Sequence, residues 1–226
     1  MENENDLVLG VDASASSLYL ALKGKGISID RSFVSIRNTD TMLLDEIVNI
    51  LKYANVSFDD LSYVALGEGP GSFTSLRIAA STLKGLTFSK GLRIKSVPTL
   101  EALFHSYQRC TDSSIVPLID ARMHRFYAAI YKNGECILNR GDLSIEGIIE
   151  RVSGNIIFTY HPLEKENIKQ LLGTDFLQSH NDKISLAEVC LIKNPSLSLI
   201  ELSYNREFDN ASKGPIYVRE HSGLIK

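Results

Sequence analysis

Two distant stretches of the chain share one pattern of apolar and polar positions. The first, LVLGVDASASSLYLALKGKG, begins at Leu7, and the second, IVPLIDARMHRFYAAIYKNG, begins at Ile115. In each, an apolar run ends at an aspartate, and a β-rich run then leads to a glycine-containing hairpin. The stretches align without a gap, with the pairs Asp12/Asp120, Ala13/Ala121, Tyr19/Tyr127, Ala21/Ala129, Leu22/Ile130 and Gly26/Gly134. The agreement favours a duplication over chance and predicts a three-stranded meander in each half.

Helical periodicity follows the first meander. Residues 42–53 place Leu43, Ile47, Ile50 and Leu51 on one stripe, which predicts a helix with one buried face. Further along, the pattern predicts a strand over 61–69, a helix over 74–88, a strand over 92–98 and a helix over 99–108. Strands that alternate with helices after an antiparallel meander predict a mixed sheet with helices on its faces.

The second half repeats the meander, but its helical signals are fewer and weaker. We expect a helix over 144–152, a short strand over 155–160, and a helix opened by a capping box of Ser185 and Glu188. The second half is therefore expected to be a reduced copy of the first.

A polar stretch over 109–114 separates the two halves. We expect an N-terminal half over residues 1–110, which carries the partner-binding helices, and a smaller C-terminal half over residues 111–226. The 226 residues, of which 44% are hydrophobic, are enough to build a core. The chain is therefore expected to fold as an ordinary globular protein.

Charge and cysteine content limit the possible partners and compartments. The formal charge of -3, from 24 basic and 27 acidic side chains, provides no excess of positive charge for tight, independent binding to a nucleic acid. Cys110, Cys136 and Cys190 are widely separated and indicate reduced thiols in a cytosol. The acidic start MENEND is unlike a secretory signal, and no stretch approaches the length of a membrane span. We expect a cytoplasmic protein.

The sharpest local signal is the glycine-rich stretch ALGEGPGSFTSLRIA, residues 65–79. Gly67, Gly69 and Gly71 permit a turn that few other residues could follow, and Ser72 or Thr74 can cap the helix that begins there. Backbone amides at a helix start can bind an anion. A tight strand-to-helix connection capped by Ser72 explains the same residues at least as well. The sequence contains neither GK[ST] nor GxSxG, so it has no P-loop and no nucleophile elbow.

The chain offers no pattern for metal binding or for acid and base catalysis. Its five histidines include no pair at helical ligand spacing, and its cysteines have no ligand spacing. The acidic pairs Asp45/Glu46 and Asp59/Asp60 are adjacent in sequence and cannot face a substrate from opposite sides. We therefore expect no metal, no cofactor and no catalytic residue.

The glycine-rich stretch also carries a family resemblance. GPGSFTSLRIA resembles the GPGSFTGLRIG signature of the TsaB (YeaZ) family, although Ser75 and Ala79 stand where the family usually has glycine. Further matches follow in the right order at GVDAS, SVPTLEAL, IDARMHRFYAAIY and GPIYVRE. The resemblance implies an α/β fold of the actin, sugar-kinase and chaperone-ATPase superfamily (ASKHA, ribonuclease H-like), whose halves are duplicated. The repeat found independently agrees with that fold.

In that superfamily, the turns after the first strand of each half clamp nucleotide phosphates. The first turn here, which contains Asp12 and Ser14, is small and hydroxylated, and it could still approach a phosphate. The second turn, Ala121 to His124, is bulky and lacks glycine, so a two-sided clamp looks broken. A vestigial phosphate site would comprise Asp12, Ser14, Gly69, Gly71 and Ser72. We favour the simpler interpretation, in which Asp12 and Asp120 cap their own turns.

The two N-terminal helices carry a surplus of apolar and small side chains. Some lie off the core stripe of the first helix and others form a small-residue strip on the second, namely Met42, Leu44, Val48, Ser75, Ala79 and Thr82. Small side chains let a partner helix come close. Packing against the first helix of the same domain explains any one small residue equally well. The resemblance favours a partner surface, because TsaB-type proteins use these helices to bind TsaD or a second copy of themselves.

The resemblance implies a non-catalytic scaffold in the complex that adds a threonylcarbamoyl group to adenosine in tRNA. Its expected partners are a TsaD-like catalytic subunit, a TsaE-like ATPase and a second copy in a homodimer, with tRNA bound only through the complex. The alternative is an enzyme, either a small-molecule kinase of the same superfamily or a glycoprotease. The kinase needs a second glycine-bearing phosphate turn, and the protease needs a metal pair or an activated nucleophile. The sequence offers neither.

Overall fold

The structure is a computed structural model that describes residues 5–34, 39–107, 111–187, 192–210 and 214. Within these residues, the chain forms two sheets of five strands each, with the orders β3-β2-β1-β4-β5 and β10-β9-β6-β7-β8. The first sheet contains β1 (Val8–Asp12), β2 (Leu18–Gly24), β3 (Ile27–Phe33), β4 (Tyr63–Gly67) and β5 (Ile94–Val97). The second contains β6 (Ser114–Asp120), β7 (Phe126–Lys132), β8 (Glu135–Leu143), β9 (Ile156–Thr159) and β10 (Ile184–Leu186).

The predicted duplication is confirmed by the pairing of the strands. β1 pairs antiparallel with β2 and parallel with β4, and in the same way β6 pairs antiparallel with β7 and parallel with β9. The β2–β3 and β7–β8 hairpins each turn through two residues with positive φ, Lys25 and Gly26 in one half and Asn133 and Gly134 in the other. Such turns match the right-handed twist of the flanking strands. The two mixed sheets confirm the predicted fold class.

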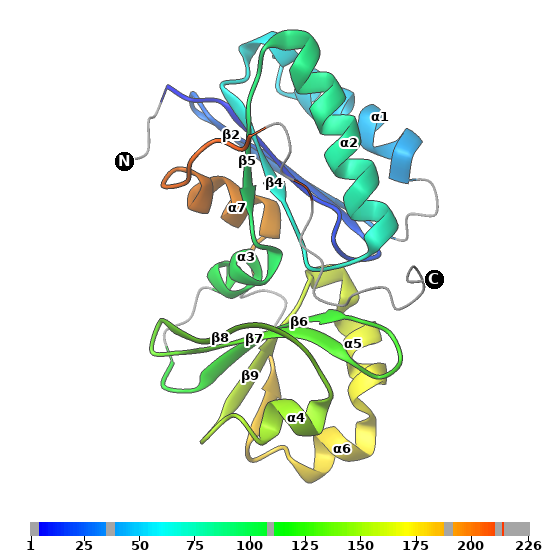
Figure 1. Cartoon of the computed structure of the whole chain (residues 1–226), viewed down its shortest axis with the longest axis vertical. Coiled ribbons are helices and arrows are strands. Elements are labelled where there is room, and N and C mark those ends of the chain that lie inside the picture. Colours follow the sequence, from blue (N-terminus) through cyan, green and yellow to red (C-terminus); the bar gives the residue numbers. More distant parts are fainter. Residues whose placement is uncertain (1–4, 35–38, 108–110, 188–191, 211–213, 215–226) are drawn as a thin grey trace, which may run out of the picture.

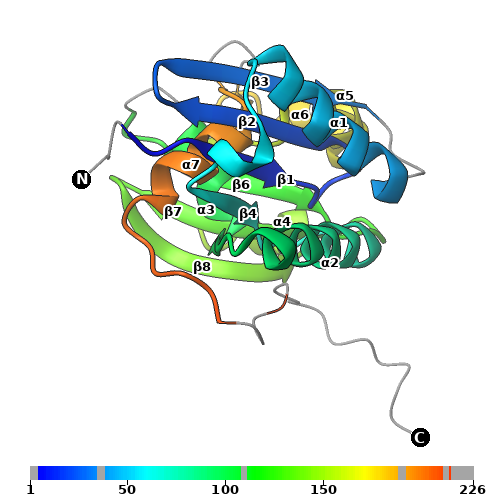
Figure 2. The same ribbon diagram turned by 90° about the horizontal axis from the view of Figure 1, so that it is seen from above.

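Helices cover both faces of the first sheet (Figure 1). Two helices, α1 (Thr39–Tyr53) and α2 (Phe73–Lys90), pack over Leu9, Val11 and other residues of one face. Val8 and Ala21 point to the opposite face, where they pack against Leu199 and Ile200 of α7 (Pro195–Ser203). Alternate residues of one strand thus enter different cores, as the two-residue period of a strand requires. Figure 2 shows α1 and α2 over the same face, viewed from above.

The packing of α7 corrects the expected division at residues 110 and 111. This helix belongs to the 111–226 range, yet it packs on β1, β2 and β4 of the first sheet. The chain therefore returns to the N-terminal half after completing the second sheet. A boundary drawn on local polarity cannot foresee such a return, because the contacts join residues far apart in sequence.

One helix connects the two halves. α3 (Thr99–Ser106) packs Leu100 and Leu103 against Ile119 and Tyr131 of the second sheet. The other face of that sheet is covered by α4 (Ile145–Ile149) and α5 (Lys165–Leu172). A further short helix, α6 (Thr174–Ser179), follows α5. The sequence did not predict α5, α6 or α7.

The helix predicted from Ser185 is wrong. Ser185 lies in β10, which pairs in parallel with β9, and Glu188 lies outside the described residues. A serine three positions before a glutamate is only a local signal, and pairing with a neighbouring strand overrides it.

Candidate functional site

A cavity of about 310 Å³ lies between the two halves, where the aspartate turns of both repeats approach each other. Its lining includes Ser14, Gly71 and Ser72 from the N-terminal half, and Arg122 and His161 from the C-terminal half. Three of the five predicted phosphate residues, Ser14, Gly71 and Ser72, thus line the cavity, whereas Asp12 and Gly69 are not part of its lining. Their contacts decide what they can bind.

Both repeated aspartates cap their own turns, as predicted. Asp12 Oδ1 accepts a hydrogen bond from the backbone N–H of Ser14 at 2.8 Å. Asp120 Oδ1 accepts one from the N–H of Arg122 at 2.7 Å. Asp12 is fully buried, whereas Asp120 is half-buried. The same carboxylate-to-amide bond thus closes both turns, in environments of different polarity.

The glycines of the predicted phosphate turn permit a close approach between two backbone segments. A Cβ at Gly71 would lie 2.1 Å from the carbonyl oxygen of Ser14, and one at Gly67 would lie 2.9 Å from Cγ of Asp12. The backbone N–H of Ser72 donates to that same Ser14 oxygen at 2.7 Å. The amide at the start of α2 therefore already has an acceptor within the protein. These contacts favour the tight strand-to-helix connection over a phosphate site.

The second turn, Ala121 to His124, is also closed by its own backbone hydrogen bonds. Arg122, Met123 and His124 all have φ between 55° and 66°. This left-handed conformation costs about 1–2 kcal/mol for each residue with a side chain. Backbone bonds from Ala121 N to Arg125 O at 3.0 Å and from Arg125 N to Arg122 O at 3.1 Å close the turn. Those two amides are directed at carbonyl groups of the turn.

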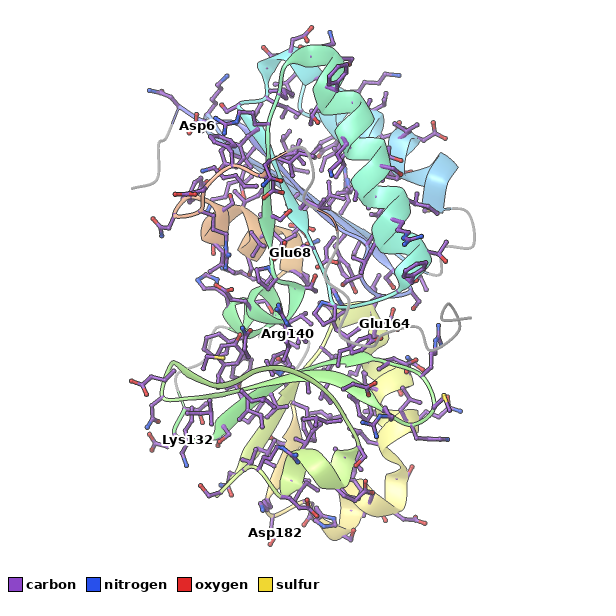
Figure 3. All side chains as sticks on the ribbon, viewed as in Figure 1. Asp6, Glu68, Lys132, Arg140, Glu164 and Asp182 are labelled. Carbon is purple, nitrogen blue, oxygen red and sulfur yellow. The ribbon has the colours of Figure 1, made fainter. Side chains whose placement is uncertain are left out.

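A cluster of polar side chains joins the two halves beside the cavity. We call it the interdomain cluster and define it as Ser14, Ser17, Tyr19, His161 and Glu164. Ser14 Oγ lies 3.0 Å from His161 Nε2, and Ser17 Oγ donates to Glu164 Oε1 at 2.9 Å. The rings of Tyr19 and His161 stack with centroids 5.0 Å apart. Figure 3 shows Glu164 at the junction of the halves.

Sequence reasoning missed this cluster. His161 and Glu164 belong to the segment between β9 and α5, and they contact residues about 150 positions earlier in the chain. Glu164 also accepts a hydrogen bond from Ser16. The three hydroxylated residues of the first turn, which could have faced an anion, thus contact groups of the other half. The Glu164 carboxylate would repel a phosphate group bound at this position.

Burial controls the ionisation of the interdomain cluster. Removal from water lowers the pKa of His161, while the nearby Asp12 and Glu164 carboxylates act in the opposite direction. Burial also raises the pKa of the Tyr19 hydroxyl, which accepts a hydrogen bond from the N–H of Leu163. Asp12 Oδ2 and His161 Nδ1 are buried without a hydrogen-bond partner among the described residues. His161 is therefore neutral in the folded protein at neutral pH.

The stability of the protein should decrease as the pH is lowered through about 6.5, the ordinary pKa of histidine. Below that pH the unfolded chain binds a proton at His161 that the folded protein, with its lowered pKa, does not bind. The stability should fall until the pH reaches that lowered pKa. Thermal melts of the protein and of His161→Gln between pH 5.5 and 7.5 measure the effect. The variant should show a shallower dependence, and identical slopes would contradict a buried neutral imidazole.

Asp12→Ala should destabilise the protein more than Asp120→Ala. Loss of the buried carboxylate leaves the Ser14 N–H without its acceptor, which costs about 1–3 kcal/mol. The half-buried Asp120 can be replaced by water, so its loss should cost about 1 kcal/mol or less. Thermal melts test this order. A variant that melts normally but abolishes tRNA modification in a reconstituted system would show that its aspartate does more than cap a turn.

The structure only partly matches the predicted helical interface. Leu44 and Val48 of α1 are 40% and 45% exposed. Met42, Ser75 and Thr82 are half-buried, while Ala79 is fully buried in the core that α1 and α2 share. The prediction is therefore wrong for Ala79, because its Cβ packs inside the domain. We call the remaining five residues, Met42, Leu44, Val48, Ser75 and Thr82, the α1–α2 surface.

One exposed apolar residue of α2 was not predicted. Phe88 has 90% of its surface exposed. Its position near the end of the helix gave no signal, since an aromatic residue at helical spacing usually faces a core.

In the described part of the chain, no helix is both long and apolar enough to cross a membrane. Nor does that part contain three or more His, Cys, Asp or Glu residues arranged to hold a metal ion.

Two meander-plus-helix halves with a cavity between them form an actin-like (ASKHA) fold. A family model described as TsaD, tRNA N6-adenosine threonylcarbamoyltransferase, matches residues 34–170. The chain is 28% identical over 177 residues to the tRNA threonylcarbamoyladenosine biosynthesis protein TsaB of Bacillus subtilis, which covers 74% of this chain and 77% of the relative. The chain belongs to the TsaB (YeaZ) family of tRNA threonylcarbamoyladenosine biosynthesis proteins.

Solved structures support the same fold. YeaZ from Pseudomonas aeruginosa superposes with a TM-score of 0.69 at 23% identity, covering 94% of this chain and 99% of that one. The ethanolamine utilization protein EutJ from Carboxydothermus hydrogenoformans has a TM-score of 0.52 at 12% identity, covering 84% of this chain and 88% of that one. The two-sheet architecture is thus shared at low sequence identity.

Proposed function

We propose that this chain is a non-catalytic scaffold subunit of the complex that makes threonylcarbamoyladenosine in tRNA. It binds a TsaD-like catalytic subunit through the α1–α2 surface. The observation that carries the proposal is the exposure of Leu44 and Val48, which stand one turn apart on α1. Exposed apolar side chains on neighbouring helices suit docking to another helix.

The contacts around the cleft support the non-catalytic part of the proposal. The amide of Ser72 and the hydroxyls of Ser14 and Ser17 are engaged within the protein. A kinase of the same superfamily would need these groups for phosphate. We therefore favour the scaffold over the kinase and over a glycoprotease.

Membership of the family supports the further partners in this proposal. A TsaE-like ATPase binds the assembled pair, and tRNA is held through the complex, since the chain has a formal charge of -3. A second copy of the chain uses the same α1–α2 surface when the catalytic subunit is absent. The chain works in the cytoplasm.

Reconstitution with purified components tests the proposal. The TsaD-like and TsaE-like proteins encoded in the same genome, together with a source of threonylcarbamoyl-adenylate, are assayed for tRNA modification with and without this chain. Modification should require the chain, and the chain alone should neither modify tRNA nor hydrolyse ATP. Robust turnover by the homogeneous chain would contradict the scaffold function, as would full modification in its absence.

A further inference from the structure

The Glu164 side chain lies at the junction of the two halves and contacts the first aspartate turn (Figure 3). Glu164 ends the 3₁₀ turn η2 (Pro162–Glu164), directly before α5, and only 9% of its surface is exposed. Its Oε1 accepts hydrogen bonds from two hydroxyls of the turn, from Ser17 at 2.9 Å and from Ser16. One carboxylate oxygen of the C-terminal half thus receives two donors of the N-terminal half.

Hydrogen bonds hold this carboxylate, and no ion pair does so in the part of the chain that the structure describes. Its second oxygen lies 3.5 Å from Asn167 Nδ2. A buried carboxylate is costly unless hydrogen bonds to it compensate for the lost water. The hydroxyls of the first turn therefore form a favourable environment for a small oxyanion, and the Glu164 side chain supplies that oxyanion.

The cavity between the halves adjoins this carboxylate. Glu164 belongs to its lining, as do Ser16, Asn167 and Arg122, whose side chains can donate hydrogen bonds. The volume of about 310 Å³ is at the lower end of the range for small-molecule sites. A free anion can therefore reach the hydroxyls through the cavity once the Glu164 side chain is removed.

We propose that Glu164 is a built-in anion, which fills from within a latent site for a small oxyanion, a carboxylate or a phosphate. The side chain takes the donors that a bound oxyanion would receive, and it holds the two halves together without a ligand. Because an attached carboxylate has a far higher effective concentration than a free anion at ordinary levels, the site stays closed in the intact chain. This closure does not depend on the α1–α2 surface.

Glu164→Ala tests the proposal, because it removes a CH2–CO2− group that differs from acetate by one hydrogen atom. Loss of two hydrogen bonds to a carboxylate should lower the melting temperature in chloride by about 5 °C or more. Acetate or phosphate at about 0.1 M, at matched ionic strength, should restore about half of this loss or more. Phosphate stabilises proteins in general, so the gain is counted relative to the unaltered chain.

Glu166→Ala is the matched control. Glu166 is exposed two residues further on and pairs with Lys169, so its loss should create no response to oxyanions. An equal response of Glu164→Ala, Glu166→Ala and the unaltered chain would overturn the proposal.

Two conservative variants decide the case if Glu164→Ala fails to fold in every buffer. Glu164→Gln keeps an oxygen that accepts the two hydroxyl bonds but removes the charge. Ser17→Ala should therefore lower the melting temperature more in the intact chain than in the Glu164→Gln background, because a hydroxyl stabilises a charged acceptor more than a neutral one. Equal losses in the two backgrounds would show that the turn has no preference for an anion and would overturn the proposal.

Discussion

Val48→Asp should abolish the association of this chain with a TsaD-like catalytic subunit while leaving its own fold intact. Val48 is 45% exposed on α1, so an aspartate there remains hydrated in the free protein. In a docked complex the carboxylate would be buried without a partner. Substitutions at the centre of an interface cost about 2–4 kcal/mol, which is about 30-fold or more in affinity. A pull-down and a titration with the catalytic subunit measure the loss.

The chain offers a matched control for that substitution. Ile137 on β8 is 60% exposed and belongs to the C-terminal half. Ile137→Asp adds the same charge at an exposed apolar position away from the α1–α2 surface, and it should bind the catalytic subunit normally. If both variants bind normally, the interface lies elsewhere. If Val48→Asp lowers the melting temperature strongly, its side chain supports the fold instead.

Ala79→Trp should unfold the isolated protein or destabilise it severely. Ala79 is completely buried in the core that α1 and α2 share, where no space for an indole exists without displacement of the helices. Overpacking by a few methylenes already costs about 1–3 kcal/mol, and an indole adds far more volume. Total stabilities of only about 5–15 kcal/mol leave little margin. Circular dichroism and a thermal melt measure the effect.

The expected result for Ala79→Trp reverses the one that the sequence suggests. If the alanine belonged to an exposed strip, the variant would fold and lose only its partner. Ser81→Trp is the control, because Ser81 is exposed on the same helix and should tolerate the larger side chain. A folded Ala79→Trp protein with an unchanged melting temperature would contradict the packing of α2 described above.

The sheets of this protein could be predicted because their signals are local. Alternating apolar residues and a hairpin at Gly26 and at Gly134 define each meander within about twenty residues. The helices α1 and α2 were predicted within a few residues for the same reason, since a single apolar stripe fixes their period. Duplication then required both halves to share one topology.

The interdomain cluster could not be predicted, because its contacts depend on how the two halves meet. Nothing around His161 distinguishes it from a surface histidine, and its partner Ser14 is distant in sequence. The burial of Ala79 could not be predicted either, because it depends on which side of α2 faces α1. Spacing places Ser75, Ala79 and Thr82 near one another, but only the packing of α1 separates the buried alanine from its half-buried neighbours.

Hydrogen exchange of this chain, measured alone and in complex with the TsaD-like catalytic subunit, tests the central claim most directly. We predict slower exchange on binding in α1 and α2, including the turns that carry Leu44, Val48 and Ser75. We predict no change in α4, α5 and α6 of the C-terminal half. Protection confined to the C-terminal half, or no protection at a concentration that saturates binding, would contradict a scaffold that docks through the α1–α2 surface.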